Sequence, residues 1–68
     1  MPKIINVEFK DGYYFFVLDD GRKVGEPISK YYRLSHATEA QLLNFVISEE
    51  GVHWPDIDED LALAPLLS

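Results

Sequence analysis

The segment Gly51-Val-His-Trp-Pro-Asp-Ile-Asp-Glu-Asp-Leu61 runs from a strand-like apolar end directly into four acidic side chains, and it decides how the chain closes. Its first part should be the returning strand of a hairpin whose other strand covers residues 45–48. Trp54, the only tryptophan, offers a large apolar surface to a core. Pro55 should end the strand because it lacks a backbone N–H. Residues 56–60 are then expected to form an exposed acidic turn.

The C-terminal residues 61–67 are apolar but contain Pro65, which disfavours a long helix. We therefore expect a single helical turn that returns its leucines to the core. The cap of this turn should be a carboxylate, either Asp58 or Asp60.

The first 27 residues predict a three-stranded antiparallel β-meander. Residues 4–9 alternate with the period of a strand, and Ile5, Val7 and Phe9 should share one face. Asp-Gly pairs then provide two turns, because glycine adopts positive φ without strain. Between these turns, residues 13–18 are apolar throughout, which indicates a central strand covered on both faces.

The third strand, residues 22–26, is short and charged, as edge strands often are. After it, Ser29 is expected to cap a short helix over residues 30–34. A clearer helix begins at the segment Thr38-Glu-Ala-Gln41, which matches the capping box. The whole pattern predicts an α+β fold with the N-terminal three-stranded antiparallel β-meander, one or two short helices, a further β-hairpin and a C-terminal helical turn.

Length and composition predict one domain over residues 1–68, close to the lower size limit for an unassisted hydrophobic core. The chain has no cysteine, which excludes disulfides and thiolate metal sites. A homodimer is a natural way for such a small domain to cover leftover apolar surface. No segment approaches the roughly 20 apolar residues of a membrane span, and no secretory signal pattern is present. We therefore expect a cytoplasmic protein that does not bind membranes.

The two halves of the chain differ in charge. All six Lys and Arg residues precede residue 34, where five acidic residues leave a net charge of +1. Residues 34–68 hold seven acidic residues and no Lys or Arg, so their net charge is −7. Such a half repels phosphates, which argues against direct nucleic-acid binding and favours a basic protein partner. The seven are Glu39, Glu49, Glu50, Asp56, Asp58, Glu59 and Asp60.

Three motifs follow one another along almost the whole chain. They are Leu18-Asp-Asp-Gly-Arg22, Arg33-Leu-Ser-His-Ala-Thr-Glu-Ala-Gln41, and His53-Trp-Pro with Asp58-Glu-Asp-Leu61 before a closing Leu66-Leu67. In this order they resemble the bacterial domain-of-unknown-function 2442 family, whose C-terminal pattern is His-Trp-Pro-x-x-Asp-Glu-Asp-Leu. The resemblance implies a small α+β domain without an established activity, often encoded beside another short protein. A toxin–antitoxin-like pairing is implied for such neighbours.

The spacing Asp56-x-Asp58-x-Asp60 is the one that opens an EF-hand calcium loop. That loop needs glycine at its sixth position and glutamate at its twelfth, where this chain has Leu61 and Leu67. We therefore predict no metal site here, and interpret the turn as a helix cap and a solvated surface.

His53 lies beside the acidic run, where it could act as a general acid or base together with Asp56. No nucleophile accompanies it at a recognisable spacing, and His36 is the only other histidine. We predict no catalytic residue and no cofactor. The aromatic run 13–16, with basic residues nearby, is typical of nucleic-acid stacking platforms, but the negative net charge favours core packing instead.

Trp54 has two interpretations, a core anchor or an interface hot spot in a surface groove. The function predicted from the sequence is a non-catalytic, antitoxin-like protein-interaction domain whose acidic C-terminal half docks a basic partner. Two alternatives stay open: an acidic mimic that inhibits a nucleic-acid-binding protein, and an enzyme or metal-dependent accessory that uses His53 and the turn at 56–60. The residues expected to contact a partner are His53, Trp54, Asp56, Asp58, Glu59 and Asp60.

Overall fold

The computed structural model describes residues 2–68 and contains six strands and four short helical segments over that range. The strands are β1 (Ile4–Lys10), β2 (Tyr13–Leu18), β3 (Lys23–Pro27), β4 (Val46–Ile47), β5 (Gly51–Trp54) and β6 (Glu59–Ala62). The helical segments are the 3-10 helix η1 (Ile28–Lys30), α1 (Tyr32–Ser35), α2 (Glu39–Leu43) and α3 (Ala64–Leu67).

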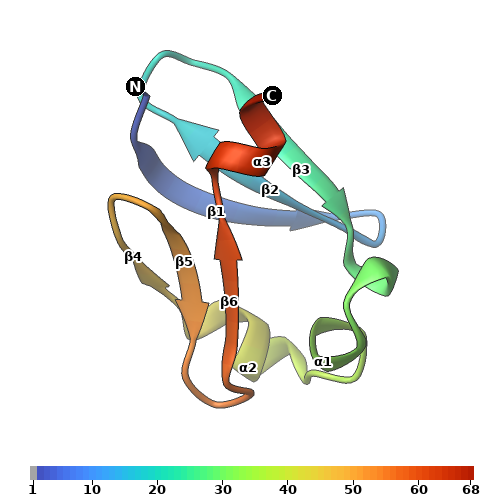
Figure 1. The fold of residues 1–68 in the computed structure, drawn as a ribbon. Helices are drawn as coiled ribbons and strands as arrows, with labels where there is room; N and C mark the ends of the chain where they lie inside the picture. The colour runs from blue at the N-terminus through green and yellow to red at the C-terminus, as the bar shows by residue number, and fades with distance from the viewer. Residues whose placement is uncertain (1) are drawn as a thin grey trace.

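The strands form two antiparallel sheets, with the orders β1-β2-β3 and β4-β5-β6. Figure 1 shows the short helices η1, α1 and α2 linking the first sheet to the second, and α3 following β6. The predicted α+β class, the N-terminal meander and the further hairpin are confirmed. Within the described residues, no helix has both the length and the apolar composition needed to cross a membrane.

A β-bulge changes which face of β1 is buried. The first turn uses the predicted Asp-Gly pair, since Asp11 and Gly12 adopt φ of 54° and 81°. Between Ile4 and Asn6, however, the register of β1 against β2 shifts by one residue. Ile4 is therefore buried and Ile5 is exposed, so the prediction that Ile5 shares a buried face with Val7 is wrong.

Strand β2 is central, as predicted, but only one of its faces is fully covered. Tyr14, Phe16 and Leu18 are buried and belong to the same core cluster as the second sheet. On the other face, Phe15 is half-buried and Tyr13 is 45% exposed. The prediction of two covered faces is therefore wrong, because the second sheet packs on one side of the meander only.

The caps predicted for the two helices between the sheets have opposite outcomes. The capping box of α2 is confirmed: the Thr38 hydroxyl accepts a hydrogen bond from the Gln41 N–H at 3.1 Å, and the Gln41 side chain accepts one from the Thr38 N–H at 2.9 Å. Ser29 caps no helix, since it lies inside η1. The N-caps of η1 and α1 are Pro27 and Tyr31, and neither makes a side-chain cap bond.

The chain after the acidic turn also differs from the prediction. Residues 59–62 form β6, which pairs with β5, so no helix begins there. The helix α3 begins only at Ala64, and its N-cap is Leu63, so neither Asp58 nor Asp60 caps it. Strand pairing is preferred because it satisfies the backbone groups of residues 59–62 along a neighbour that the turn places beside them.

The buried side chains of both sheets form one hydrophobic cluster, which α1 and the segment before α3 help to close. In Figure 1, β6 runs from the acidic turn towards α3, which contacts β3 of the first sheet. The C-terminal end thus connects the two sheets. The largest fully buried side chains are Trp54, Tyr14, Phe16, Leu18, Leu34 and Leu63.

Candidate functional site

The acidic turn between β5 and β6 is held from two sides. The Asn44 side chain, just after α2, donates a hydrogen bond to Asp56 Oδ2 at 3.0 Å. From α1, the Arg33 guanidinium donates to the main-chain carbonyl of Asp58. Asp58 adopts φ of 51°, a left-handed conformation that aspartate tolerates better than most residues. Both Asp56 and Asp58 are exposed, so the turn presents carboxylates in a defined loop.

The contact between Arg33 and the acidic turn was not predicted from the sequence. Arg33 belongs to the half of the chain with a net charge of +1, yet the fold places it against the acidic turn. It binds a carbonyl oxygen rather than a carboxylate. Its place in the motif Arg33–Gln41 was the only sign in the sequence that it matters.

Trp54 is part of the core. Its side chain is fully buried, and its indole N–H donates to the Leu42 carbonyl at 3.0 Å. Of its two interpretations, the structure therefore shows the core anchor, and Trp54 offers no surface to a partner. Its predicted place among the partner-binding residues is corrected accordingly: it holds β5, and with it the acidic turn, against α2.

His53 and Asp60 form a cross-strand pair on the exposed side of the β5–β6 hairpin. The two residues are directly opposite each other in the ladder, and His53 Nδ1 lies 2.8 Å from Asp60 Oδ1. The partner of His53 is thus Asp60 and not Asp56, which bonds Asn44 instead. Glu59, half-buried at the start of β6, accepts a hydrogen bond from the Asp60 N–H at 3.1 Å.

A shallow hollow of about 270 Å³ surrounds this pair. Ser48 and Glu50 lie on one of its sides, and the Ser48 hydroxyl bonds the backbone of Gly51. Among the described residues, no group of three or more His, Asp or Glu side chains is arranged to hold a metal ion. The chemical groups that line this hollow are the His53 imidazole, the carboxylates of Asp60 and Glu50, and the Ser48 hydroxyl.

The ion pairs are unevenly distributed over the structure. In residues 2–68, every salt bridge made by a Lys or Arg joins residues between 8 and 30. Lys23 binds Glu8 at 2.8 Å and Arg22 binds Asp20 at 2.8 Å. Lys10, Arg22 and Lys23 are the basic residues that flank the aromatic run 13–16, and the last two are thus paired with carboxylates, which disfavours a nucleic-acid platform there. Conversely, the carboxylates from Glu39 onward have no Lys or Arg side chain paired with them in that range.

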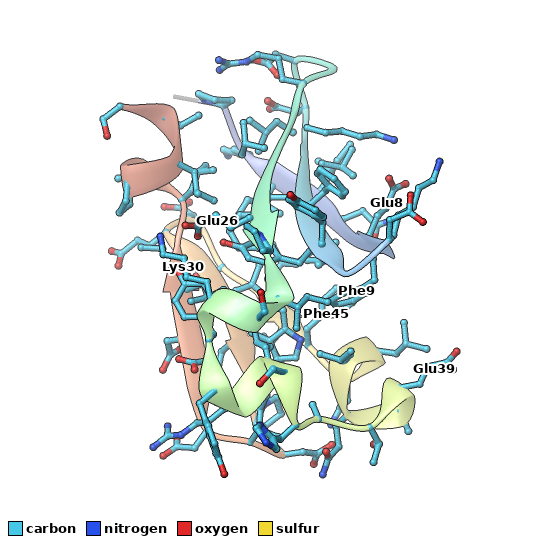
Figure 2. All side chains as sticks on the ribbon, turned by 90° about the vertical axis from the view of Figure 1, so that its right-hand side faces the viewer. Glu8, Phe9, Glu26, Lys30, Glu39 and Phe45 are labelled. Carbon is cyan, nitrogen blue, oxygen red and sulfur yellow. The ribbon has the colours of Figure 1, made fainter. Side chains whose placement is uncertain are left out.

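A second cluster of titratable groups, also unpredicted, fastens η1 to the first sheet. The Glu26 carboxylate on β3 accepts hydrogen bonds from the hydroxyls of Tyr14 at 2.6 Å and Tyr31 at 2.8 Å. Lys30 binds its second oxygen, and Figure 2 shows Lys30 and Glu26 close together where β3 leads into η1. The bond from Lys30, followed by that from Tyr14, lowers the pKa of Glu26 to about 2. Burial, and then the bond to Glu26, raises the pKa of Tyr14. These groups stabilise one another inside the fold, which is a structural role.

Comparisons with known proteins identify relatives but no activity. The solution NMR structure of an uncharacterised protein from Chromobacterium violaceum is similar, with a TM-score of 0.79 and 26% identity. The match covers 96% of this chain but only 63% of that one, so this domain spans less than two thirds of that protein. A crystal structure of a protein of unknown function from Rhodospirillum rubrum shares the fold, with a TM-score of 0.78, 24% identity and coverage of 98% and 86%.

No curated protein matches the sequence. The family model described as Protein of unknown function (DUF2442) matches residues 4–68, nearly the whole chain, and the chain therefore belongs to this family.

Proposed function

We propose that this domain is a non-catalytic protein-interaction module of the cytoplasm, whose acidic turn and β5–β6 hairpin dock a basic partner. The carrying observation is that, in the described structure, no carboxylate from Glu39 onward forms a salt bridge with a Lys or Arg, while the cations at residues 22, 23 and 30 are paired elsewhere. Arg33 contacts the turn only through the main-chain carbonyl of Asp58. Neighbouring carboxylates repel one another, and a basic partner relieves that repulsion.

The contacts fall on five of the six residues named from the sequence. His53, Asp56, Asp58, Glu59 and Asp60 lie on the turn and on the two strands that it joins. Trp54 supports them from the core. The bonds from Asn44 and Arg33 hold the turn before any partner arrives, so little ordering entropy is lost on binding. An antitoxin-like role, in which the partner is a basic toxin encoded by a neighbouring gene, is the specific form we propose.

The test is a comparison of two variants that remove the same charge. Asp58→Asn/Glu59→Gln/Asp60→Asn neutralises the proposed surface, and Asp11→Asn/Glu39→Gln/Glu49→Gln, which removes three exposed charges away from it, is the matched control. A protein recovered from source-cell lysate at low salt by the wild type and the control, but not by the first variant, supports the proposal. For that protein, purified, the association rate should fall steeply with added salt. Equal binding by both variants overturns the proposed surface.

A nucleic-acid mimic would use the same carboxylates, with a nucleic-acid-binding protein as the partner. Competition distinguishes this version from ordinary partner binding. If a DNA or RNA duplex displaces the domain from the recovered protein, the acidic surface imitates phosphates. If the domain and the nucleic acid bind together, it does not.

The hollow around His53 favours one candidate of another class, an enzyme or an accessory that uses acid–base chemistry. Asp60 at 2.8 Å can accept the Nδ1 proton of His53, which leaves Nε2 free as a base. His53→Ala and Asp60→Asn should then abolish any activity associated with the protein. Full biological function of His53→Ala in cells would exclude this candidate.

A further inference from the structure

The hollow around His53 has a floor of two small residues. Gly51 and Ala62 lie opposite each other in the β5–β6 ladder, and both line this hollow of about 270 Å³. No side chain fits at position 51 as the strands stand, since a Cβ on Gly51 would lie 2.0 Å from the Leu61 carbonyl oxygen. The floor therefore stays open unless the two strands move apart.

Polar side chains form the walls of the same hollow. Asp60 Oδ1 lies 2.8 Å from His53 Nδ1, so the imidazole holds this carboxylate beside the floor. Glu50 and Ser48 come from the other end of the hairpin, where the Ser48 hydroxyl bonds the backbone of Gly51. Within residues 2–68, no Lys or Arg forms a salt bridge with Asp60 or Glu50. Both carboxylates are therefore open to a cation from outside.

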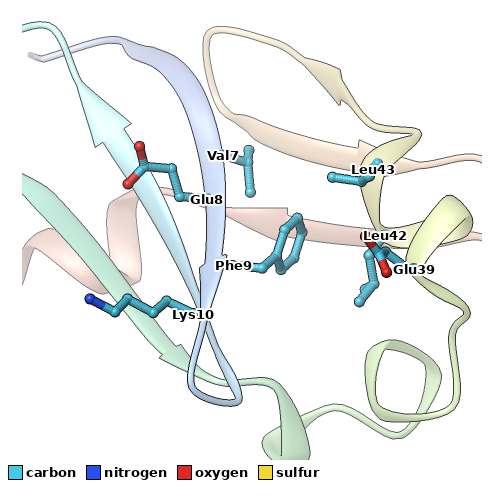
Figure 3. Close-up of a pocket in the computed structure, with 7 residues that line it drawn as sticks. All are labelled: Val7, Glu8, Phe9, Lys10, Glu39, Leu42 and Leu43. Carbon is cyan, nitrogen blue, oxygen red and sulfur yellow. The ribbon is translucent and has the colours of Figure 1, made fainter.

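The size of the hollow favours one long side chain over a larger ligand. Pockets for drug-sized molecules usually measure about 300–1,000 Å³, and this hollow is smaller and open to solvent. A larger hollow of about 550 Å³, between β1 and α2, has a mainly apolar lining. Figure 3 shows Val7 and Phe9 facing α2 there, with Lys10 on the opposite side of the strand. Charge recognition thus belongs to the smaller hollow.

We propose that this smaller hollow receives an arginine side chain of the basic partner. The guanidinium binds the carboxylates of Asp60 and Glu50, and the aliphatic stem lies over Gly51 and Ala62. This inference rests on the proposed function, because it names the group of the partner that the hairpin binds.

The chemistry of the walls favours arginine over lysine. A guanidinium presents five N–H donors in a fixed plane, so it can bind two carboxylates from separate segments at once. It is also more weakly hydrated than an ammonium group, which lowers the cost of entering a hollow. Hydrogen bonds between a guanidinium and carboxylates are among the strongest that proteins form.

The arginine probe is N-acetyl-arginine amide, titrated into the ¹⁵N-labelled protein at constant ionic strength up to about 100 mM, a range suited to the weak affinity of one side chain. The backbone amides of Gly51, His53 and Ala62 should show saturable NMR shifts. N-acetyl-citrulline amide has nearly the same shape without the charge, and it should give none. N-acetyl-lysine amide should bind at least about threefold more weakly. Absence of saturable shifts with arginine, or equal binding of any two of the three probes, overturns the proposal.

Two variants separate the shape of the hollow from its charge. Ala62→Leu fills the floor without changing the charge, and it should weaken binding of the arginine probe by about tenfold or more. Ala62 is exposed on β6, so the larger side chain does not disturb the core, and the amide spectrum of the free variant verifies the fold. Asp60→Asn removes one wall carboxylate and should weaken binding at least about threefold.

Asp58→Asn is the matched control, because it removes one charge from the turn outside the hollow and asparagine tolerates the left-handed conformation of that residue. It should change binding of the arginine probe less than about twofold. Unchanged affinity in Ala62→Leu, or equal losses in Asp58→Asn and Asp60→Asn, would show attraction by net charge alone and overturn the proposal.

The probe experiment needs no partner protein, so the two proposals can fail separately. If a basic partner is recovered but the arginine probe does not bind, the hollow is not the arginine site and the docking surface stands. If the probe binds but no partner is recovered, the hollow remains a guanidinium site and the docking proposal fails.

Discussion

Trp54 is the single residue with the clearest energetic role. Its ring fills the core shared by the two sheets, and its N–H satisfies the Leu42 carbonyl near the end of α2. Trp54→Ala should lower the free energy of unfolding by about 3–5 kcal/mol, because it leaves a large cavity and an unpaired carbonyl. Urea titration followed by circular dichroism measures this loss. A loss under about 1 kcal/mol would contradict the core-anchor role.

Tryptophan fluorescence of the wild type is an independent test of whether Trp54 is buried. A buried indole emits at a shorter wavelength than tryptophan in water. The emission maximum should therefore move to a longer wavelength on unfolding. Native emission that already resembles tryptophan in water would contradict the burial of Trp54.

Glu26 should make stability depend on pH in the acid range. Its pKa in the fold, about 2, is below its ordinary value of 4.5, so the unfolded chain takes up the proton first as the pH falls. The stabilisation is therefore complete above about pH 4.5 and is lost as the pH drops from there to about 2. We expect this part of the unfolding free energy to be about 1–3 kcal/mol.

Glu26→Gln identifies the source of that pH dependence. The variant should be less stable than the wild type at neutral pH, and the difference between them should shrink towards pH 2. Glu8→Gln, whose carboxylate pairs with Lys23 on the exposed side of the sheet, is the matched control. Parallel stability curves for wild type and Glu26→Gln from pH 7 to about 2 would show that the Tyr14–Glu26–Tyr31 bonds do not couple to protonation.

At the scale of elements, α2 and η1 differ at their N-termini. The N-cap of α2 makes a side-chain hydrogen bond, and the N-cap of η1 makes none. Thr38→Ala removes the hydroxyl that accepts from the Gln41 N–H, and it should lower stability by about 1 kcal/mol. Ser29→Ala is the internal control, because Ser29 makes no cap bond, and it should change stability by less than about 0.5 kcal/mol. Chemical denaturation of both variants measures the difference, and a larger loss at Ser29 would contradict the assigned caps.

Elements with a local chemical signal were predictable from the sequence, and β6 was not. The Asp11-Gly12 turn and the capping box at Thr38 each depend on residues within a few positions of one another. Whether residues 59–62 become a strand depends on a neighbour, β5, that is brought beside them only by the turn. Their own residue types are compatible with a helical turn as well, so tertiary pairing decides.

The bulge in β1 is a second feature that could not be predicted from the sequence, and it involves only one residue. Alternation placed Ile5 with Val7, but one extra residue against β2 moved Ile4 into the core and Ile5 to the surface. A register shift cannot be recognised from the residue types of the strand. It does matter for the molecule, since it determines which of the two isoleucines enters the core.

For the whole molecule, the shared core predicts a single unfolding transition. Trp54 and Val52 of the second sheet belong to the same buried cluster as Tyr14 and Phe16 of the first. Because neither sheet keeps a core of its own without the other, Trp fluorescence and far-UV circular dichroism should report the same midpoint in urea. Two separated transitions would show that the sheets are independently stable.

The sequence by itself determined the α+β class, the meander, the α2 cap, the second hairpin and the concentration of acidic residues after residue 34. Each of these depends on residue type, on spacing of a few positions or on a count, and all of those are present in the linear chain. The sequence also named the candidate surface residues Asp56, Asp58, Glu59 and Asp60 for their charge, and His53 for its place beside them.

Only the tertiary structure decided how the segment from Gly51 to Leu61 is used. It buried Trp54, paired His53 with Asp60, and set Arg33 and Asn44 against the acidic turn. These outcomes depend on contacts between residues 7 to 25 positions apart, which form when both sheets close on one core. Local propensity cannot specify such contacts, because their free energy comes from neighbours that the chain acquires by folding.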